Sequence, residues 1–107
     1  MSPGEKIADL GGVKQSYQAL KKLLAEQGNP PSPVEGLTND QLFFVSFGQV
    51  WCAKARPEFE RLVVATDPHP LPRFRVLGTA RNLEEFAEAF QCKAGTPMNP
   101  KEKCEVW

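Results

Sequence analysis

One short stretch holds the only histidine of the chain among residues that could restrain it. Residues 67–75 read Asp-Pro-His-Pro-Leu-Pro-Arg-Phe-Arg, so prolines flank His69 and two arginines follow it. Proline fixes the backbone φ angle, so His69 and Arg75 should be held with little freedom. A rigid loop with a proton-transfer group and a fixed cation is a typical setting for chemistry. The alternative is a proline-stiffened surface connection with a solvated imidazole.

Two carboxylates stand one helical turn apart near the start of the chain. Apolar residues recur at steps of three and four over residues 5–26, which predicts a helix. Glu5 and Asp9 project from the same side of it, at the border of the apolar stripe. Like charges so placed destabilise a helix unless a cation or a hydrogen-bond partner lies between them. The pair is therefore either an ordinary solvated acidic turn or is held by such a partner.

The three cysteines, Cys52, Cys92 and Cys104, are an odd number. At least one must stay free or pair outside the chain. Cys92 and Cys104 could close a short loop, or all three could pair with a segment that is absent. A zinc site of three cysteines and His69 is a further alternative, although the close C-x-x-C pairing of such sites is missing.

Two long helices should organise the first half of the chain. Ser2 or Gly4 could cap the helix over residues 5–26, Gly28 should end it, and Gly11-Gly12 inside it predicts a closely packed backbone. After a loop at residues 29–36, residues 38–41 match a capping box and begin a second helix. That helix is apolar nearly all round and should be buried on most sides. Because 107 residues can hardly cover it, a larger body is expected to be missing.

Shorter elements follow. Pro57 can occupy the first position of a short helix, and residues 74–77 read as an extended segment ended by Gly78. Asn82 can cap a helix that runs to about Phe90. Residues 93–104 should be irregular, and the apolar indole of Trp107 should pack into a groove.

Composition limits the class of protein. The chain has 107 residues, 41% of them hydrophobic and 24% charged, which is typical of one globular domain. A formal net charge of zero argues against nucleic-acid binding. No window is apolar enough to span a membrane, and the first residues lack the features of a signal peptide.

Four segments, at residues 4–12, 42–52, 66–76 and 98–107, together resemble one family, the neprilysin-like zinc metallopeptidases, which include the endothelin-converting enzymes. Residues 4–12, Gly-Glu-Lys-Ile-Ala-Asp-Leu-Gly-Gly, are similar to its Gly-Glu-Asn-Ile-Ala-Asp segment. The other three are its buried helix ending in Gln-Val-Trp-Cys, its substrate-site loop and its extreme C-terminus, which match residues 42–52, 66–76 and 98–107. The resemblance covers the whole chain. It implies a mainly α fold, a helical C-terminal subdomain fragment of a zincin-type metallopeptidase with long irregular loops, as one domain over residues 1–107.

The resemblance also implies roles for single residues. Glu5 matches the third zinc ligand, and Asp9 the carboxylate that orients a zinc-binding histidine. His69 matches the residue that stabilises the oxyanion, and Arg75 the cation that binds a substrate carbonyl.

Further roles follow from the same resemblance. Val50 and Trp51 match residues that line the pocket for the apolar side chain after the scissile bond. The three cysteines match positions that form disulfides with cysteines upstream of this segment, which implies an extracellular or cell-surface setting.

The chain departs from the family in lacking an H-E-x-x-H motif. Two zinc ligands and the general base would therefore lie outside it, and the isolated chain should be inactive and should not bind zinc tightly. Lys6, where the family usually has asparagine, places a cation beside Glu5. The leading hypothesis is part of a zinc metalloendopeptidase that cleaves peptides on the amino side of apolar residues, together with the remainder of the peptidase chain. The alternatives are a non-catalytic interaction module without bound metal and the small Cys3His domain.

Overall fold

The computed structural model describes residues 3–106. Within this range five α-helices follow one another, α1 (Pro3–Glu26), α2 (Asn39–Val50), α3 (Pro57–Thr66), α4 (Pro72–Arg81) and α5 (Glu84–Phe90). Loops and turns join them, with one isolated bridge between Thr96 and Asn99. The predicted mainly helical fold with irregular connections is therefore confirmed. No helix of the described range is long and apolar enough to cross a membrane.

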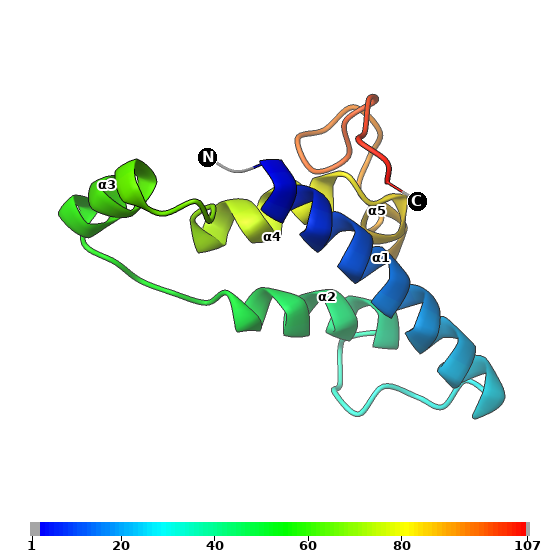
Figure 1. Cartoon of the computed structure of the whole chain (residues 1–107). Coiled ribbons are helices and arrows are strands. Elements are labelled where there is room, and N and C mark those ends of the chain that lie inside the picture. The colour runs from blue at the N-terminus through cyan, green and yellow to red at the C-terminus, as the bar shows by residue number, and fades with distance from the viewer. Residues whose placement is uncertain (1–2, 107) are drawn as a thin grey trace.

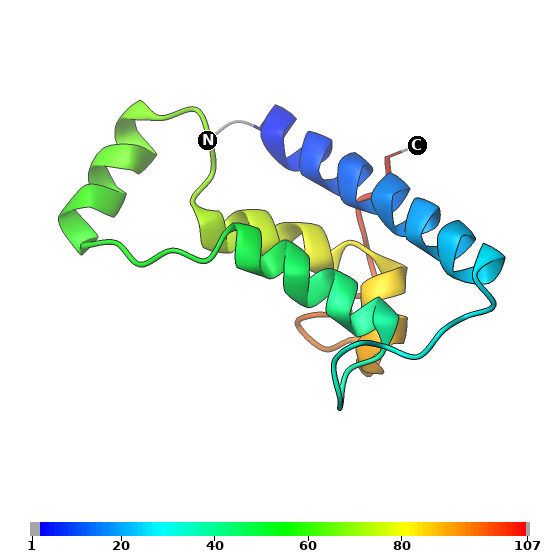
Figure 2. The same cartoon turned by 90° about the horizontal axis from the view of Figure 1, so that it is seen from below.

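α4 is the central helix, because it packs against α1, α2 and α5 (Figures 1 and 2). The core lies where these helices meet and is formed by Leu10, Val13, Tyr17, Phe44 and Leu83. Its centre is aromatic. The ring of Phe44 stacks on Tyr17 with centroids 5.6 Å apart and meets Phe86 edge-on at 5.3 Å. These contacts join α1, α2 and α5. The N-terminal halves of α1 and α4 lie outside this aromatic centre and contribute to a polar cluster.

α1 confirms the first predicted helix. It begins at Pro3, so the suggested cap at Ser2 lies outside the described residues and Gly4 is already helical. Gly28, with a φ angle of 76°, follows its end as predicted. The close packing expected at Gly11-Gly12 is wrong at Gly12, which is exposed and would place an added Cβ atom in open space. Gly11 is buried.

α2 has the predicted start, and this chain buries little of it. The Thr38 hydroxyl accepts from the Gln41 backbone N–H, and the Gln41 side chain accepts from the Thr38 N–H, which completes the capping box. Within this chain Phe44 is the only buried residue of α2, which agrees with the expectation that 107 residues can hardly cover this apolar helix. α4 and α5 cover one side of it, and Val45 and Val50 on other sides are exposed.

α3 stands apart from the other helices (Figure 1). Pro57 occupies its first turn, as predicted. None of its residues is buried, and Phe59, Leu62 and Val64 are all exposed. An ion pair between Glu60 and Arg73, at 3.1 Å, links it to the start of α4.

α4 corrects the prediction of an extended segment at residues 74–77. Pro72 lies in its first turn, where the missing N–H costs nothing, and the Leu71 carbonyl accepts from the backbone N–H groups of Phe74 and Arg75. The helix runs through Gly78, because packing on three sides outweighs a weak local preference.

Asn82 ends α4 instead of capping α5, so its predicted role is wrong. Its amide donates to the Gly78 carbonyl at 2.7 Å, and its side-chain oxygen accepts from the Cys104 backbone N–H at 2.8 Å. Leu83 precedes α5 without a side-chain cap. α5 itself ends at Phe90, as predicted.

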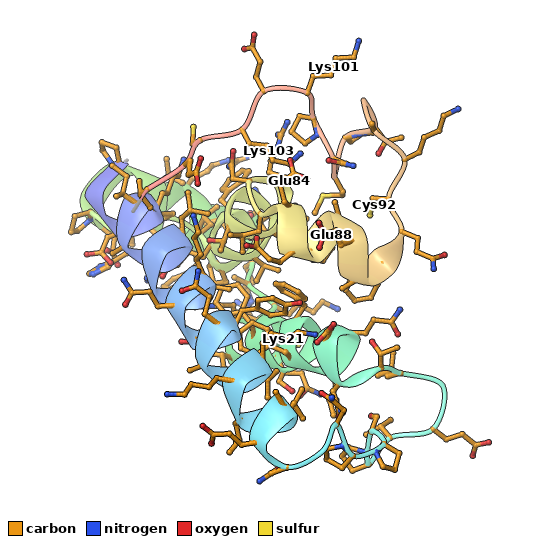
Figure 3. The ribbon with its side chains drawn as sticks, turned by 90° about the vertical axis from the view of Figure 1, so that its right-hand side faces the viewer. Lys21, Glu84, Glu88, Cys92, Lys101 and Lys103 are labelled. Atoms are coloured by element: carbon orange, nitrogen blue, oxygen red, sulfur yellow. The ribbon has the colours of Figure 1, made fainter. Side chains whose placement is uncertain are left out.

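The irregular tail after α5 folds back over α5 and α1, with Lys103 lying beside Glu84 (Figure 3). Two ion pairs hold it, Lys103 to Glu84 at 2.9 Å and Lys14 to Glu105 at 3.0 Å. The groove predicted for Trp107 lies outside the described residues.

Candidate functional site

Arg75 joins the two carboxylates of α1. Its Nε atom donates to Asp9 Oδ2 at 2.7 Å, and its Nη2 atom donates to Asp9 Oδ1 at 2.8 Å. Nη2 also lies 3.4 Å from Glu5 Oε2. Arg75 and Asp9 are both only 12% exposed, so this fork of charge-assisted bonds is largely shielded from water. Arg75 is therefore the cation that two carboxylates one turn apart require, and the alternative of an ordinary solvated acidic turn is wrong.

His69 reaches the same cluster from the loop between α3 and α4. Its Nε2 atom is 3.8 Å from Glu5 Oε1. On the other side of the ring, Nδ1 contacts Asp67 Oδ1 at 2.7 Å, and the same oxygen accepts from the His69 backbone N–H at 2.8 Å. His69 is half-exposed, so its orientation depends on Asp67 and on the neighbouring prolines.

Asp67 is the residue for which sequence reasoning assigned no role. It lies two residues before His69, a spacing at which an aspartate side chain commonly accepts from the following backbone and forms a local turn. That spacing was the signal that could have identified it. In the structure it links backbone and imidazole, and so selects which ring nitrogen faces Glu5.

Trp51 closes the cluster from the end of α2. The guanidinium carbon of Arg75 lies 4.0 Å from the centroid of the Trp51 ring, a cation–π contact. Val50, which precedes it, is exposed. The structure thus brings Glu5, Asp9, His69, Arg75 and Trp51 together from four elements, with Val50 at the edge.

The electrostatics of the cluster favour ionised groups. The Asp9 carboxylate raises the pKa of Arg75 through its hydrogen bonds, against the opposing effect of burial. The backbone N–H of His69, and then its ring, lower the pKa of Asp67 below its ordinary value. The cluster contains three carboxylates, of Glu5, Asp9 and Asp67, and one guanidinium, so its acidic groups outnumber its fixed cation. Such a cluster can attract a further cation.

A zinc site needs several ligand side chains in one place. Among residues 3–106, no three side chains of His, Cys, Asp or Glu gather in a geometry that could hold a metal ion. Glu5 would supply one carboxylate, whereas Zn²⁺ in proteins takes three or four protein ligands. The three cysteines and His69 are therefore not gathered into one group among the described residues.

The three cysteines remain free thiols, and the short loop that Cys92 and Cys104 could close is not formed. Lys6, the cation next to Glu5 in sequence, lines a groove of about 390 Å³ with Ile7 and Gly78. Neither Glu5 nor Asp9 lines that groove.

A mainly helical chain that gathers carboxylates, an imidazole and a guanidinium on one face fits the class of metallopeptidases. The family model described as Peptidase family M13 matches residues 1–106, so the chain belongs to this family. It is 50% identical over 105 residues to endothelin-converting enzyme 1 of Cavia porcellus and to membrane metallo-endopeptidase-like 1 of Homo sapiens. It is 47% identical over 110 residues to neprilysin-1 of Caenorhabditis elegans.

These matches cover nearly the whole of this chain but little of each relative. The first two cover 97% of this chain and 14% of the relative, and the third covers 100% and 15%. The resemblance to neprilysin and endothelin-converting enzymes that the sequence motifs indicated is therefore confirmed. The chain corresponds to about one seventh of such a protein.

Proposed function

We propose that the chain acts as part of a zinc metalloendopeptidase that hydrolyses peptide bonds on the amino side of apolar residues. In this proposal Glu5 is the third zinc ligand, and Asp9 orients a zinc-binding histidine that lies outside residues 1–107. His69 stabilises the oxyanion, Arg75 binds a substrate carbonyl, and Val50 and Trp51 line the pocket for the apolar side chain. Family membership supports peptidase chemistry, and the assignment of residues is the proposed part.

One observation carries the proposal: residues far apart in sequence meet in one cluster. Arg75 contacts Asp9 and Glu5 across 66 and 70 residues of sequence. His69 and Trp51 join them from two further segments. Side chains of these types, partly shielded and mutually oriented, are what an amide-hydrolysing site needs for binding and charge stabilisation.

The cluster fits a zinc site as a partial donor set. A bound zinc ion would supply a Lewis acid and an activated water when all its ligands are present. Glu5 has one oxygen near Arg75 and the other near His69, and it is 38% exposed, so a cation approaching from outside can reach it. Asp9 accepts two bonds from Arg75, and a carboxylate has further lone pairs with which to hold an imidazole N–H.

His69 has the arrangement of a charge-stabilising donor. When both ring nitrogens carry a proton, Nδ1–H donates a hydrogen bond to Asp67 and Nε2–H can donate to an oxygen that gains negative charge. Arg75 is held at Nε and Nη2, and its remaining end can donate to a peptide carbonyl.

Several features favour the remainder of a peptidase chain as the partner. The accessible surface is 7494 Å². A compact monomer of this mass would expose about 5,900 Å² by the usual scaling of surface with mass. The buried indole N–H of Trp51 has no acceptor among the described residues, and such donors normally have one. We propose that the rest of the peptidase covers this surface, and that Cys52, Cys92 and Cys104 pair with its cysteines in an extracellular or cell-surface setting.

A chimera tests the proposal. This chain replaces the matching 105-residue segment of endothelin-converting enzyme 1, and the product is assayed for bound zinc and for cleavage of a peptide with an apolar residue after the scissile bond. Glu5→Ala should lose zinc and activity together. His69→Ala should keep zinc but lower kcat by about 100-fold, the cost of removing one oxyanion donor.

Glu58→Ala is the matched control, because Glu58 is an exposed glutamate of α3, the helix that stands apart from the others (Figure 1). It should retain both zinc and activity. Stoichiometric zinc in the Glu5→Ala chimera would show that the ligand assignment is wrong. A chimera that folds and binds no zinc with the native residues would favour the non-catalytic module instead.

A further inference from the structure

We propose that Trp51 is a positioning residue for Arg75: it fixes the plane of the guanidinium so that one end, Nη1, is presented to a peptide carbonyl. This inference rests on the proposed function and adds to the pocket-lining role of Trp51. It starts from the 4.0 Å contact between the Arg75 guanidinium and the Trp51 ring.

The hydrogen bonds of Arg75 leave one end of the group available. A guanidinium carries five N–H donors in a fixed fork. Nε and Nη2 are directed to Asp9 at 2.7 and 2.8 Å, and Nη2 also approaches Glu5. Among the described residues, no acceptor is bonded to Nη1. The two N–H groups of Nη1 are therefore the free donors of a cation that is otherwise engaged.

Hydrogen bonds along one edge do not by themselves hold the plane of the group. A bidentate carboxylate still permits rocking about the axis that joins it to the guanidinium. The indole ring restrains that motion, because a planar cation stacks best when parallel to an aromatic face. Asp9 from α1 thus holds the edge, and Trp51 from the end of α2 holds the face.

Arg73 shows what is missing without such restraints. It lies on the same helix, and its guanidinium carbon is 5.0 Å from the Phe74 ring. Its side chain is nevertheless 56% exposed, and its only hydrogen-bond partner among the described residues is Glu60. Of these two arginines, Arg75 alone has both a carboxylate fork and an indole ring against its guanidinium.

A double-mutant cycle in the peptidase chimera tests the inference. Trp51→Leu, which keeps apolar bulk but removes the aromatic face, should lower kcat/KM about tenfold, and Trp51→Phe should recover most of the loss. In an Arg75→Ala background, Trp51→Leu should have little further effect. An equal loss in both backgrounds would overturn the inference, because Trp51 would then act as a pocket wall only.

A spectroscopic measurement on the 107-residue chain separates this inference from the proposed function. The Arg75 side-chain protons should be shifted upfield by the indole ring current, and Trp51→Leu should abolish the shift. Arg61, an exposed residue of α3, is the reference and should not change. Unshifted Arg75 protons in a folded chain would overturn the stacking, whether or not the chimera is active. An inactive chimera with shifted protons would instead contradict the proposed function alone.

Discussion

Replacing Arg75 with alanine is expected to destabilise the chain far more than replacing Arg73 on the same helix. Arg75→Ala removes two short charge-assisted bonds and leaves Asp9 unpaired at 12% exposure. Removing one partner of a fully buried pair costs about 3–5 kcal/mol. Because some solvent reaches this pair and the loss of Trp51 stacking adds to the cost, we expect about 3 kcal/mol. That is a large part of the roughly 5–15 kcal/mol that stabilises a typical domain.

Arg73→Ala is the matched control, since it also removes an arginine paired with a carboxylate, but at an exposed site. Surface pairs of this kind contribute about 0.5 kcal/mol. Urea unfolding of the purified chain, followed by far-UV circular dichroism, measures both. With a slope of roughly 1–1.5 kcal/mol per M urea, the midpoint should fall by about 2–3 M for Arg75→Ala and by less than about 0.5 M for Arg73→Ala.

Salt provides a second comparison. One molar sodium chloride should remove most of the cost of Arg73→Ala and little of the cost of Arg75→Ala, because screening is weak for a shielded pair. Equal midpoint shifts for the two variants would refute the argument that shielding makes the Arg75 cluster a major source of stability.

Three further outcomes are expected. Burial, and then a neighbouring carboxylate, raise the pKa of Tyr17, the only tyrosine, to about 12. Tyrosinate absorbance should therefore titrate near pH 12, and the stability contributed by the protonated side chain should be lost as pH rises from 10 to 12. An absorbance midpoint near pH 10 would contradict this. Because the pKa of Asp67 lies below its ordinary value of 3.8, the contact with His69 should be lost only as the pH falls below 3.8. The NMR signals of the single histidine should report this transition, and Asp67→Asn should remove it. Gly12→Ala should stabilise the chain by about 1 kcal/mol in urea unfolding, because the added Cβ atom meets open space. Gly28→Ala should destabilise it in the same assay, because Gly28 has a φ angle of 76°. A destabilising effect of Gly12→Ala would contradict the finding that the space beside Gly12 is open.

Local signals in the sequence were enough for several elements. These signals are the 3.6-residue periodicity of the first helix, the capping box at Thr38, and Pro57 in the first turn of α3. Each acts over one or two helical turns, so it can be recognised in the sequence without tertiary structure. The same holds for the Glu5 and Asp9 pair, whose spacing suggested either a solvated acidic turn or a neighbouring cation or hydrogen-bond partner. The family motifs indicated which residues belong to one site, and the match to Peptidase family M13 confirms the family that these motifs indicated.

Tertiary packing decided the path of residues 72–81 and, with it, the site. An extended segment would place Arg73 and Arg75 on one face, because strand side chains alternate. In α4 they lie about 200° apart, so Arg73 is directed to Glu60 of α3 and Arg75 to Asp9 of α1. The contacts of α4 with three other helices set this outcome. Such contacts join residues far apart in sequence, so no local pattern could report them.

The sequence by itself thus determined the helices with strong local signals, the paired carboxylates and the family. Only the tertiary structure showed that Arg75 is the cation between those carboxylates, that Trp51 stacks on it and that Asp67 orients His69. The physical reason is that helix formation depends on neighbours within a turn, whereas the geometry of the site depends on how α1, α2 and α4 pack around a common core.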